Sequence, residues 1–178
     1  MMSTRTIASC VLASAALGAL ACSDEGPTSK SRERVQAQTP PMGAAALEAW
    51  LATGAYKDWQ CEEAAQERSP FPHGTNRICS NAAISRALHE RGDWPEGAAS
   101  VKEIFAAPGD EEPSGYAVFL KTAKGSAGGD NWYWYERVGD TTYADGLGEA
   151  LCVDCHETAG SSADALPGAR DMVFTPIE

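Results

Sequence analysis

The sequence predicts an α+β fold in which an antiparallel sheet is flanked by helices. Apolar residues recur at helical spacing before residue 92, whereas residues 98–138 alternate every two residues and are rich in aromatic and β-branched side chains. The chain has 178 residues, of which 43% are hydrophobic. It is therefore long enough for one packed domain preceded by a leader.

Residues 1–21 are expected to be an export signal. Arg5 is the only charged residue in them, and the small apolar stretch IASCVLASAALGALA follows. The stretch ends at Cys22, which resembles the lipidated cysteine of the bacterial lipobox, although that box usually has leucine where Ala19 stands. The same residues also fit an ordinary A-x-A cleavage site. We expect a periplasmic or cell-envelope lipoprotein, anchored through Cys22 alone.

Residues 22–41 are polar, contain prolines and are nearly free of large apolar side chains, which predicts a flexible tether. One domain is then expected at 42–178. The formal net charge of −11 argues against nucleic acid as a partner, because nucleic acid favours basic patches. Outside the leader, no apolar run is long enough to span a bilayer.

Two short helices are expected first in the domain. Leu47, Trp50 and Leu51 lie at i, i+3 and i+4 spacing in the stretch PPMGAAALEAWLATG, between helix-ending prolines and glycine. A second helix is expected at about 81–91, with Ser80 as its N-cap and a glycine directly after it.

Residues 61–75 predict mostly loop, and the strands come mainly after the helices. Glycine, proline, aspartate and serine turns separate the expected strands, which are 77–79, 98–107, 115–123, 131–138 and a final short strand at 171–178. In the fourth of these, Trp132 and Trp134 are expected to face one side of the sheet and Tyr133 and Tyr135 the other.

Five cysteines remain after the export signal, and Cys61 and Cys79 are expected to form a disulfide in an oxidising compartment. The alternative is that both are free buried thiols. With Cys152 and Cys155 in a motif of their own, Cys22 is left over, and a lipid anchor accounts for it.

The motif Cys152-Val153-Asp154-Cys155-His156 has the pattern C-x-x-C-H. A structural zinc site needs four ligands, and no second cysteine or histidine pair has suitable spacing. A thioredoxin-like redox pair needs a βαβ context that this sequence lacks. Covalent c-type haem fits best, with the two thiols joined to the haem vinyl groups and His156 as the iron ligand. The haem would therefore lie near the C-terminus.

The sixth position on the iron has no outstanding candidate ligand. Methionine and histidine are the side chains that fill it in electron carriers, and the axial ligand tunes the potential. The candidates after the leader are Met42, Met172, His73 and His89. Because none stands out, the sequence favours an open site.

Four stretches together resemble the cytochrome P-460 family of periplasmic haem proteins. They are WPEGAASVKEIFAA (94–107), GYAVFLKTAKGSAGGDNWYWYE (115–136), LCVDCHE (151–157) and DMVFT (171–175). The resemblance implies a mostly antiparallel sheet with flanking helices, often in a homodimer. It identifies 42–178 as a cytochrome P-460-like haem domain.

The resemblance also implies residue roles. Family members that oxidise hydroxylamine have a lysine covalently bonded to the porphyrin, in a strand reading roughly G-T-x-x-V-K-E, and Lys102 matches it. Arg77 matches the position of an arginine that lines the distal pocket. Glu149, or alternatively Glu136, is the candidate for the acid that helps deprotonate the substrate.

Three functions follow as expectations. In the first, the protein is an oxidoreductase acting on hydroxylamine or a related small nitrogen species, with an electron-accepting redox protein as partner. In the second, it binds nitric oxide without turnover, as the related cytochromes c-prime-beta do. In the third, it is a six-coordinate electron-transfer cytochrome. An intact Lys102 favours the first function.

Overall fold

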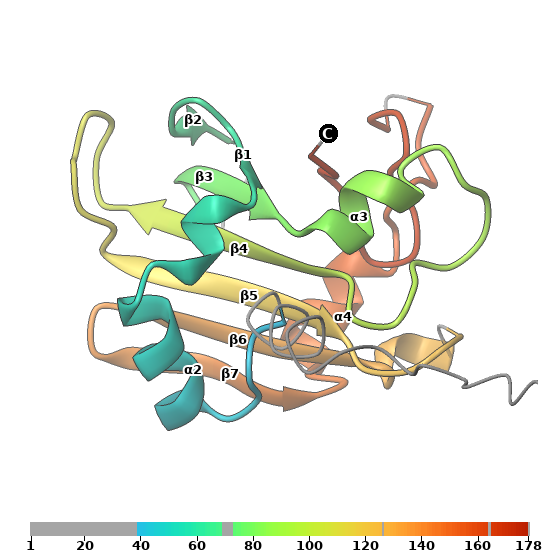
Figure 1. The fold of residues 1–178 in the computed structure, drawn as a ribbon, viewed down its shortest axis with the longest axis horizontal. Coiled ribbons are helices and arrows are strands. Elements are labelled where there is room, and N and C mark those ends of the chain that lie inside the picture. Colours follow the sequence, from blue (N-terminus) through green and yellow to red (C-terminus); the bar gives the residue numbers. More distant parts are fainter. Residues whose placement is uncertain (1–38, 69–72, 126, 164, 178) are drawn as a thin grey trace, which may run out of the picture.

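A seven-stranded antiparallel sheet organises the chain, as the computed structural model in Figure 1 shows. The structure describes residues 39–68, 73–125, 127–163 and 165–177. The strand order is β1-β3-β4-β5-β6-β7, and β2 also pairs with β3. The strands are β1 (Gln60–Cys61), β2 (Gln66–Glu67), β3 (Thr75–Ser80), β4 (Ala99–Phe105), β5 (Gly115–Lys121), β6 (Trp132–Val138) and β7 (Thr141–Leu147).

Helices flank this sheet, so the predicted α+β class is confirmed. They are α2 (Ala44–Ala52), η1 (Ala55–Asp58), α3 (Ala82–Ala87), η2 (Ala127–Gly129) and α4 (Ala150–His156). In Figure 1, α2 lies over the left part of the sheet, whereas α3 and α4 lie toward its right-hand end. The expected export signal, Cys22 and residues 22–38 of the expected tether lie outside the described residues.

The first predicted helix is present as α2, with Leu47 and Leu51 buried. Gly54 follows it in the left-handed conformation, with φ of 70°. The second predicted helix needs correction, because α3 is shorter than 81–91 and its N-cap is Asn81 rather than Ser80. The Asn81 side chain accepts hydrogen bonds from the first-turn amides, whereas Ser80 ends β3 and its hydroxyl bonds that of Ser100 at 2.7 Å.

The central strands lie within two residues of their predicted bounds, but two other expectations are wrong. β7 was not expected, and it follows β6 through the two-residue turn at Gly139 and Asp140. The described part of the segment expected as a final strand, 171–177, is not a strand. An isolated bridge between Arg170 and Val173 closes a tight turn there.

Each face of the sheet packs its own core, and the alternation predicted for β6 sorts the aromatic residues between them. Trp132 and Trp134 belong to the core shared with α3, α4 and the C-terminal segment. Tyr133 and Tyr135 belong to the core shared with α2 and η1. We call these the α4 face and the α2 face.

The predicted disulfide between Cys61 and Cys79 is present. The two cysteines are opposite each other in the β1–β3 ladder, and Cys79 is fully buried in the core of the α2 face. The bridge therefore ties the short edge strand β1 to the body of the sheet.

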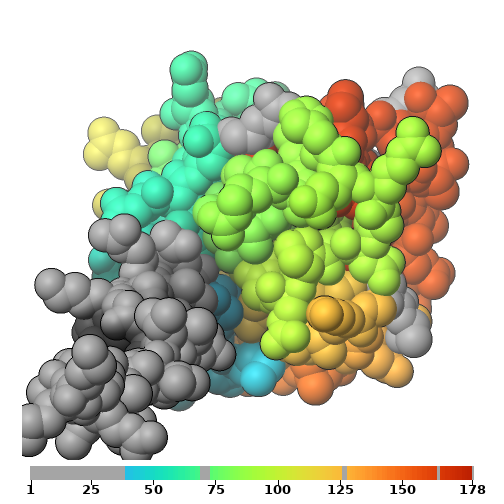
Figure 2. All heavy atoms as spheres, turned by 45° about the vertical axis from the view of Figure 1, so that its right-hand side comes forward, coloured from blue at the N-terminus to red at the C-terminus, as the bar shows by residue number. Residues whose placement is uncertain are grey.

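The C-terminal segment packs against the α3 region, as the red and light-green surfaces of Figure 2 show. The Arg170 guanidinium donates to the carbonyl of Ala87 at 2.7 Å and to that of Gly92 at 2.6 Å. It also lies over the Trp94 ring, 3.6 Å from the ring centroid. Within the described ranges, no helix is long and apolar enough to cross a membrane.

Candidate functional site

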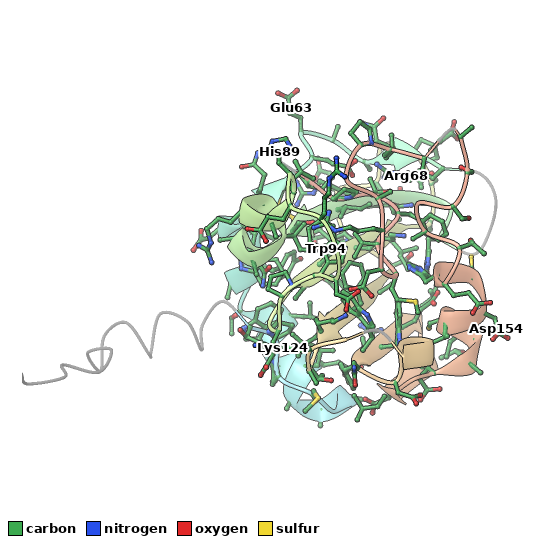
Figure 3. The ribbon with its side chains drawn as sticks, turned by 90° about the vertical axis from the view of Figure 1, so that its right-hand side faces the viewer. Glu63, Arg68, His89, Trp94, Lys124 and Asp154 are labelled. Carbon is green, nitrogen blue, oxygen red and sulfur yellow. A yellow bond between two sulfur atoms is a disulfide. The ribbon has the colours of Figure 1, made fainter. Side chains whose placement is uncertain are left out.

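Helix α4 carries both thiols and the histidine of the C-x-x-C-H motif. Cys152, Cys155 and His156 have i, i+3 and i+4 spacing, so they project from one side of the helix. Val153 is buried in the core of the α4 face, and Asp154 points outward from the domain (Figure 3). The helix therefore presents two free thiols and an imidazole together.

The His156 ring is held in one tautomer by the backbone. Its Nδ1 lies 2.6 Å from the carbonyl oxygen of Met172, and because a carbonyl only accepts, Nδ1 carries the proton. Burial lowers the pKa of His156 to about 4, so the ring is neutral near pH 7. The lone pair is then on Nε2, the arrangement typical of a metal-binding histidine whose other nitrogen bonds a carbonyl.

Aromatic rings surround the same imidazole. The ring centroid of Trp134 lies 4.8 Å from that of His156, that of Phe174 lies 5.2 Å away, and that of Phe119 lies 6.4 Å away. Such contacts restrict rotation of the ring and exclude water from it. His156 is thus fixed in orientation as well as in protonation.

The Met172 carbonyl is itself held by a buried ion pair. Asp171 and Met172 both have positive φ, 41° and 71°, which is uncommon for residues other than glycine. The Asp171 carboxylate accepts from Lys121 Nζ at 2.7 Å, the Trp94 amide at 2.8 Å and Trp132 Nε1 at 3.3 Å. Lys121 is fully buried and its charge is paired there. We call Lys121 and Asp171 the turn clamp.

The strand register places three residues in one row across the α4 face. Lys102 on β4 is opposite Ala117 on β5, which is opposite Glu136 on β6. The next row on this face contains Phe119 and Trp134, which contact His156. Lys102 and Ala117 are only half-buried although they lie on central strands. The protein therefore does not fully cover this part of the face.

Lys102, the lysine predicted from the sequence, has an amine whose pKa is lowered. Burial first, and then the positive charge of Arg68, lower its pKa to about 8, while the carboxylates of Glu136 and Glu62 oppose the shift. About a tenth of the amine is then uncharged at pH 7, far more than in an ordinary lysine. An uncharged amine beside His156 is chemically able to act as a nucleophile.

Glu136 lies beside a histidine that the sequence gave no reason to prefer. Its Oε1 is 3.4 Å from Nδ1 of His73, and both side chains are mostly buried, 9% and 18% exposed. The His73 ring centroid lies 6.5 Å from that of His156. Glu136, His73, Lys102 and His156 therefore form one cluster on the α4 face.

Arg77 is not brought to this cluster. The register pairs Ile78, and not Arg77, with Lys102, so Arg77 faces the opposite side of the sheet. There its Nε donates to Glu103 at 2.7 Å, and the Tyr56 hydroxyl donates to the same carboxylate at 2.6 Å. Arg77 is therefore part of the α2 face.

Arg68 reaches the α4 face in its place. Its guanidinium donates to the side chain of Asn76 at 2.7 Å and forms an ion pair with Glu62. Asn76 is on the same face of β3 as Ile78, whose partner is Lys102. Arg68 lies in a stretch that the sequence predicted as loop. Only its charge could have suggested it as a candidate.

Glu149 lies next to the motif but away from the row. It precedes the first residue of α4, and its carboxylate covers Gly146, where an added Cβ would meet Oε1 at 2.4 Å. Burial raises the pKa of the Cys152 thiol to about 12, and the negative charges of Glu136 and Glu149 contribute to the rise. Of the two candidate acids, only Glu136 is in the row with Lys102.

The remaining candidates for the sixth iron position lie elsewhere. Met42 is 54% exposed and precedes α2, on the opposite face of the sheet. The Met172 side chain is buried in the core, and it is the Met172 carbonyl that contacts His156. His89 and Asp154 of α4 lie on opposite sides of the molecule (Figure 3). Of the four candidate side chains, that of His73 is the one whose ring lies against His156, with ring centroids 6.5 Å apart.

Comparison with known proteins agrees with the resemblance noted in the sequence. A family model described as cytochrome P460 matches residues 53–175, which is more than half of the chain. The match includes the C-x-x-C-H motif, the Lys102 strand and the turn clamp. No curated protein matches the chain significantly.

Proposed function

Because the chain belongs to the cytochrome P460 family, we propose that it carries a c-type haem and oxidises hydroxylamine or a related small nitrogen species there. The observation that carries the proposal is the presentation of His156. Its imidazole is neutral, its Nδ1 is bonded to Met172, and its Nε2 is left to bind a metal beside two free thiols. Haem c suits this set of side chains better than any other common group.

The residues present fit the cofactor. Cys152 and Cys155 would hold it through thioether bonds, and His156 would hold the iron through Nε2. The half-buried Lys102 and Ala117 leave room on the sheet face for one edge of a flat group. When bound, the haem would supply the redox chemistry, taking electrons from the substrate and passing them to an external acceptor.

Lys102 is proposed to be covalently joined to the haem edge. Support comes from its place on the α4 face and from its pKa of about 8, which makes the uncharged amine far more available near neutral pH than in an ordinary lysine. A buried free ammonium beside a porphyrin would lose its hydration at considerable cost, and a covalent bond removes that charge. Distortion of the ring by such a bond is one of the means by which a protein tunes a haem.

Glu136 is proposed as the residue that accepts protons from the substrate, in preference to Glu149. Oxidation of hydroxylamine releases protons together with electrons, so a base must lie near the reacting nitrogen. Glu136 is in the row with Lys102 and is only 9% exposed, whereas Glu149 covers Gly146 beside the motif. Arg68 is close enough to affect Lys102 and adds positive charge to the same region.

Export and anchoring complete the proposal. The family assignment and the C-x-x-C-H motif both fit a protein that acts outside the cytoplasm, where bacterial haem attachment takes place. Cys22 would carry the lipid, and residues 22–41 would tether the domain to the membrane. The partners would be an electron-accepting redox protein and, in a homodimer, a second copy of the chain.

A six-coordinate electron-transfer cytochrome is the second candidate function. One observation favours it, the position of His73 at 6.5 Å from His156 between ring centroids. The nitric oxide-binding alternative gains no such support, because the aromatic rings of Phe119, Trp134 and Phe174 surround His156 itself.

The absorption spectrum of the purified protein, with and without hydroxylamine, tests the proposal. We expect hydroxylamine to reduce the haem in stoichiometric amounts and to be consumed in many turnovers when an artificial electron acceptor is present. A haem that hydroxylamine neither binds nor reduces would leave the electron-transfer function instead. A Cys152→Ala/Cys155→Ala variant, which lacks covalent haem, is the control for chemistry by free iron.

A further inference from the structure

We propose that His73 is the second axial ligand of the haem iron in the substrate-free protein, opposite His156. The proposal rests on the haem attachment proposed above. It goes beyond it by assigning the sixth position of the iron, which the motif leaves open. It also makes substrate entry a competition with a residue of the chain itself.

The spacing of the two imidazoles carries the inference. An imidazole nitrogen binds a transition metal at about 2 Å, and the ring centroid lies about 1 Å behind that nitrogen, so two imidazoles on opposite sides of one iron have centroids about 6 Å apart. The centroids of His73 and His156 are 6.5 Å apart. A single iron therefore fits between the two rings without a large movement of either.

The Nδ1 atoms of both rings face oxygen acceptors. His156 Nδ1 bonds the Met172 carbonyl, and His73 Nδ1 faces Glu136 Oε1 at 3.4 Å. His73 Nδ1 is buried and makes no complete hydrogen bond, so a small shift toward Glu136 would satisfy it. A carboxylate on Nδ1 is the usual outer partner of a metal-binding histidine, and it leaves Nε2 for the metal.

The neighbours of the two rings indicate where a bound haem would lie. His156 packs on Trp134, and Glu136 is two residues further along the same face of β6. His73, beside Glu136, is therefore displaced from His156 along the strand direction. A flat group held between the rings would meet the sheet edge-on, close to the half-buried row of Lys102 and Ala117. The same placement brings the Lys102 amine to the rim of the group, where its proposed bond would form.

Two consequences follow for the proposed reaction. With haem bound and His73 on its iron, hydroxylamine would have to displace His73, so substrate binding would be slower than at a vacant position. The displaced imidazole, paired with Glu136, then lies beside the bound substrate and can take up a proton. His73 would thus act first as an iron ligand and afterwards as a neighbour of the base.

The spin state of the ferric haem tests the proposal, and measuring it does not require catalytic activity. Electron paramagnetic resonance and absorption of the ferric wild-type protein should give a low-spin signal for bis-histidine ligation. His73→Ala should convert it to a high-spin signal, and added imidazole should restore the low-spin form. His89→Ala, which removes a histidine on the other side of the molecule, should leave the spectrum unchanged.

His73→Met gives a second readout for the case in which the alanine variant folds poorly. Methionine in place of one histidine should keep the iron low-spin and raise its midpoint potential, because methionine–histidine ligation raises haem potentials. A high-spin wild type with covalent haem, or a His73→Ala spectrum equal to that of the wild type, would overturn the inference alone. A protein without covalent haem would overturn the proposed function and this inference with it.

Discussion

At the scale of single residues, the chemistry of the site depends on which nitrogen or oxygen each side chain leaves available. His156 gives its Nδ1 proton to a backbone carbonyl and keeps the Nε2 lone pair. Lys102 is kept partly uncharged by burial. Glu136 keeps its carboxylate between Lys102 and His73 in the cluster on the α4 face. Each property follows from neighbours that lie far apart in the sequence.

Lys102→Ala should remove the proposed bond to the haem while leaving haem attached through the two cysteines. The absorption spectrum should shift toward that of an ordinary c-type haem, and hydroxylamine oxidation should be suppressed. Lys124→Ala is the matched control, because Lys124 is an exposed lysine in the turn after β5. An unchanged spectrum and rate in Lys102→Ala would show that this lysine has no part in the site.

Glu136→Gln should lower the turnover of hydroxylamine on the order of 10²- to 10⁴-fold, the usual contribution of a positioned base, because the amide cannot accept a proton. Glu149→Gln should retain most of the activity, since that carboxylate covers Gly146. Steady-state rates at saturating substrate would separate the two variants. Loss of activity in Glu149→Gln with an active Glu136→Gln would reverse the assignment.

At the scale of elements, the orientation of His156 depends on a turn at Asp171 and Met172 and not on a strand. The sequence DMVFTPIE has the composition of a strand, but a buried carboxylate with three donors holds Asp171 and Met172 at positive φ. This conformation costs energy, and the turn clamp compensates for it. The result is a carbonyl directed at His156.

Lys121→Met should reveal the contribution of the turn clamp. It leaves Asp171 as a buried charge without its cation, and breaking a buried pair in this way typically costs about 3–5 kcal/mol. The free energy of unfolding should fall by that amount in a denaturant titration, and the midpoint potential of the haem should change. A Lys121→Met/Asp171→Asn double variant should recover part of the stability, and an unchanged stability in the single variant would contradict the clamp.

The predictions that the structure corrected concern places where strand register or tertiary contacts determine the local conformation. The helix at Leu47 and Leu51 and the alternating strand with Trp132 and Trp134 were predictable, because their periodicity is local. β7 could also have been expected, since a glycine–aspartate pair after an alternating strand is a hairpin signal. The turn at Asp171 could not, because its cause is a lysine that lies 50 residues away.

Arg77 illustrates the same limit within the site. Its distance in sequence from Lys102 places it on the neighbouring strand, but a difference of one residue in register moves a side chain to the other face. Ile78 is the residue opposite Lys102, so Arg77 faces Glu103 instead. His73 and Glu136 were both candidates in the sequence, but only the fold shows that they lie side by side, because no motif joins them.

At the scale of the whole molecule, the two faces of the sheet have different roles. The α2 face contains the disulfide, the Arg77–Glu103 pair and a core of aliphatic and tyrosine side chains. The α4 face contains every residue assigned to the haem. Changes on the α2 face should therefore affect stability with little effect on the spectrum, and each of the two faces can be tested separately.

A Cys61→Ala/Cys79→Ala variant tests this division. Its loop of 18 residues suggests a loss of about 3 kcal/mol of stability by chain entropy. The haem spectrum and hydroxylamine reduction should stay as in the wild type, since the bridge is on the opposite face. Non-reducing peptide mapping of the wild type should show the two cysteines joined. A changed spectrum in the variant would contradict the separation of roles.

Attachment to the membrane through Cys22 is proposed for the full-length chain. If Cys22 is lipidated, the wild type should partition with membranes and Cys22→Ser should become soluble, because several acyl chains anchor firmly while the sequence of the tether is nearly free of large apolar side chains. Fractionation of cells with immunoblotting measures this. Equal membrane partition of both forms would show that the anchor is elsewhere or absent.

The central claim, a haem held by Cys152, Cys155 and His156 and joined to Lys102, is tested most directly by mass spectrometry after acid–acetone treatment. The account predicts an intact mass increased by one haem. It also predicts a digest in which one haem peptide contains both the 152–156 segment and the strand with Lys102. A haem peptide with the cysteine segment alone would contradict the lysine bond. Extraction of the haem, leaving the mass of the bare chain, would contradict the claim as a whole.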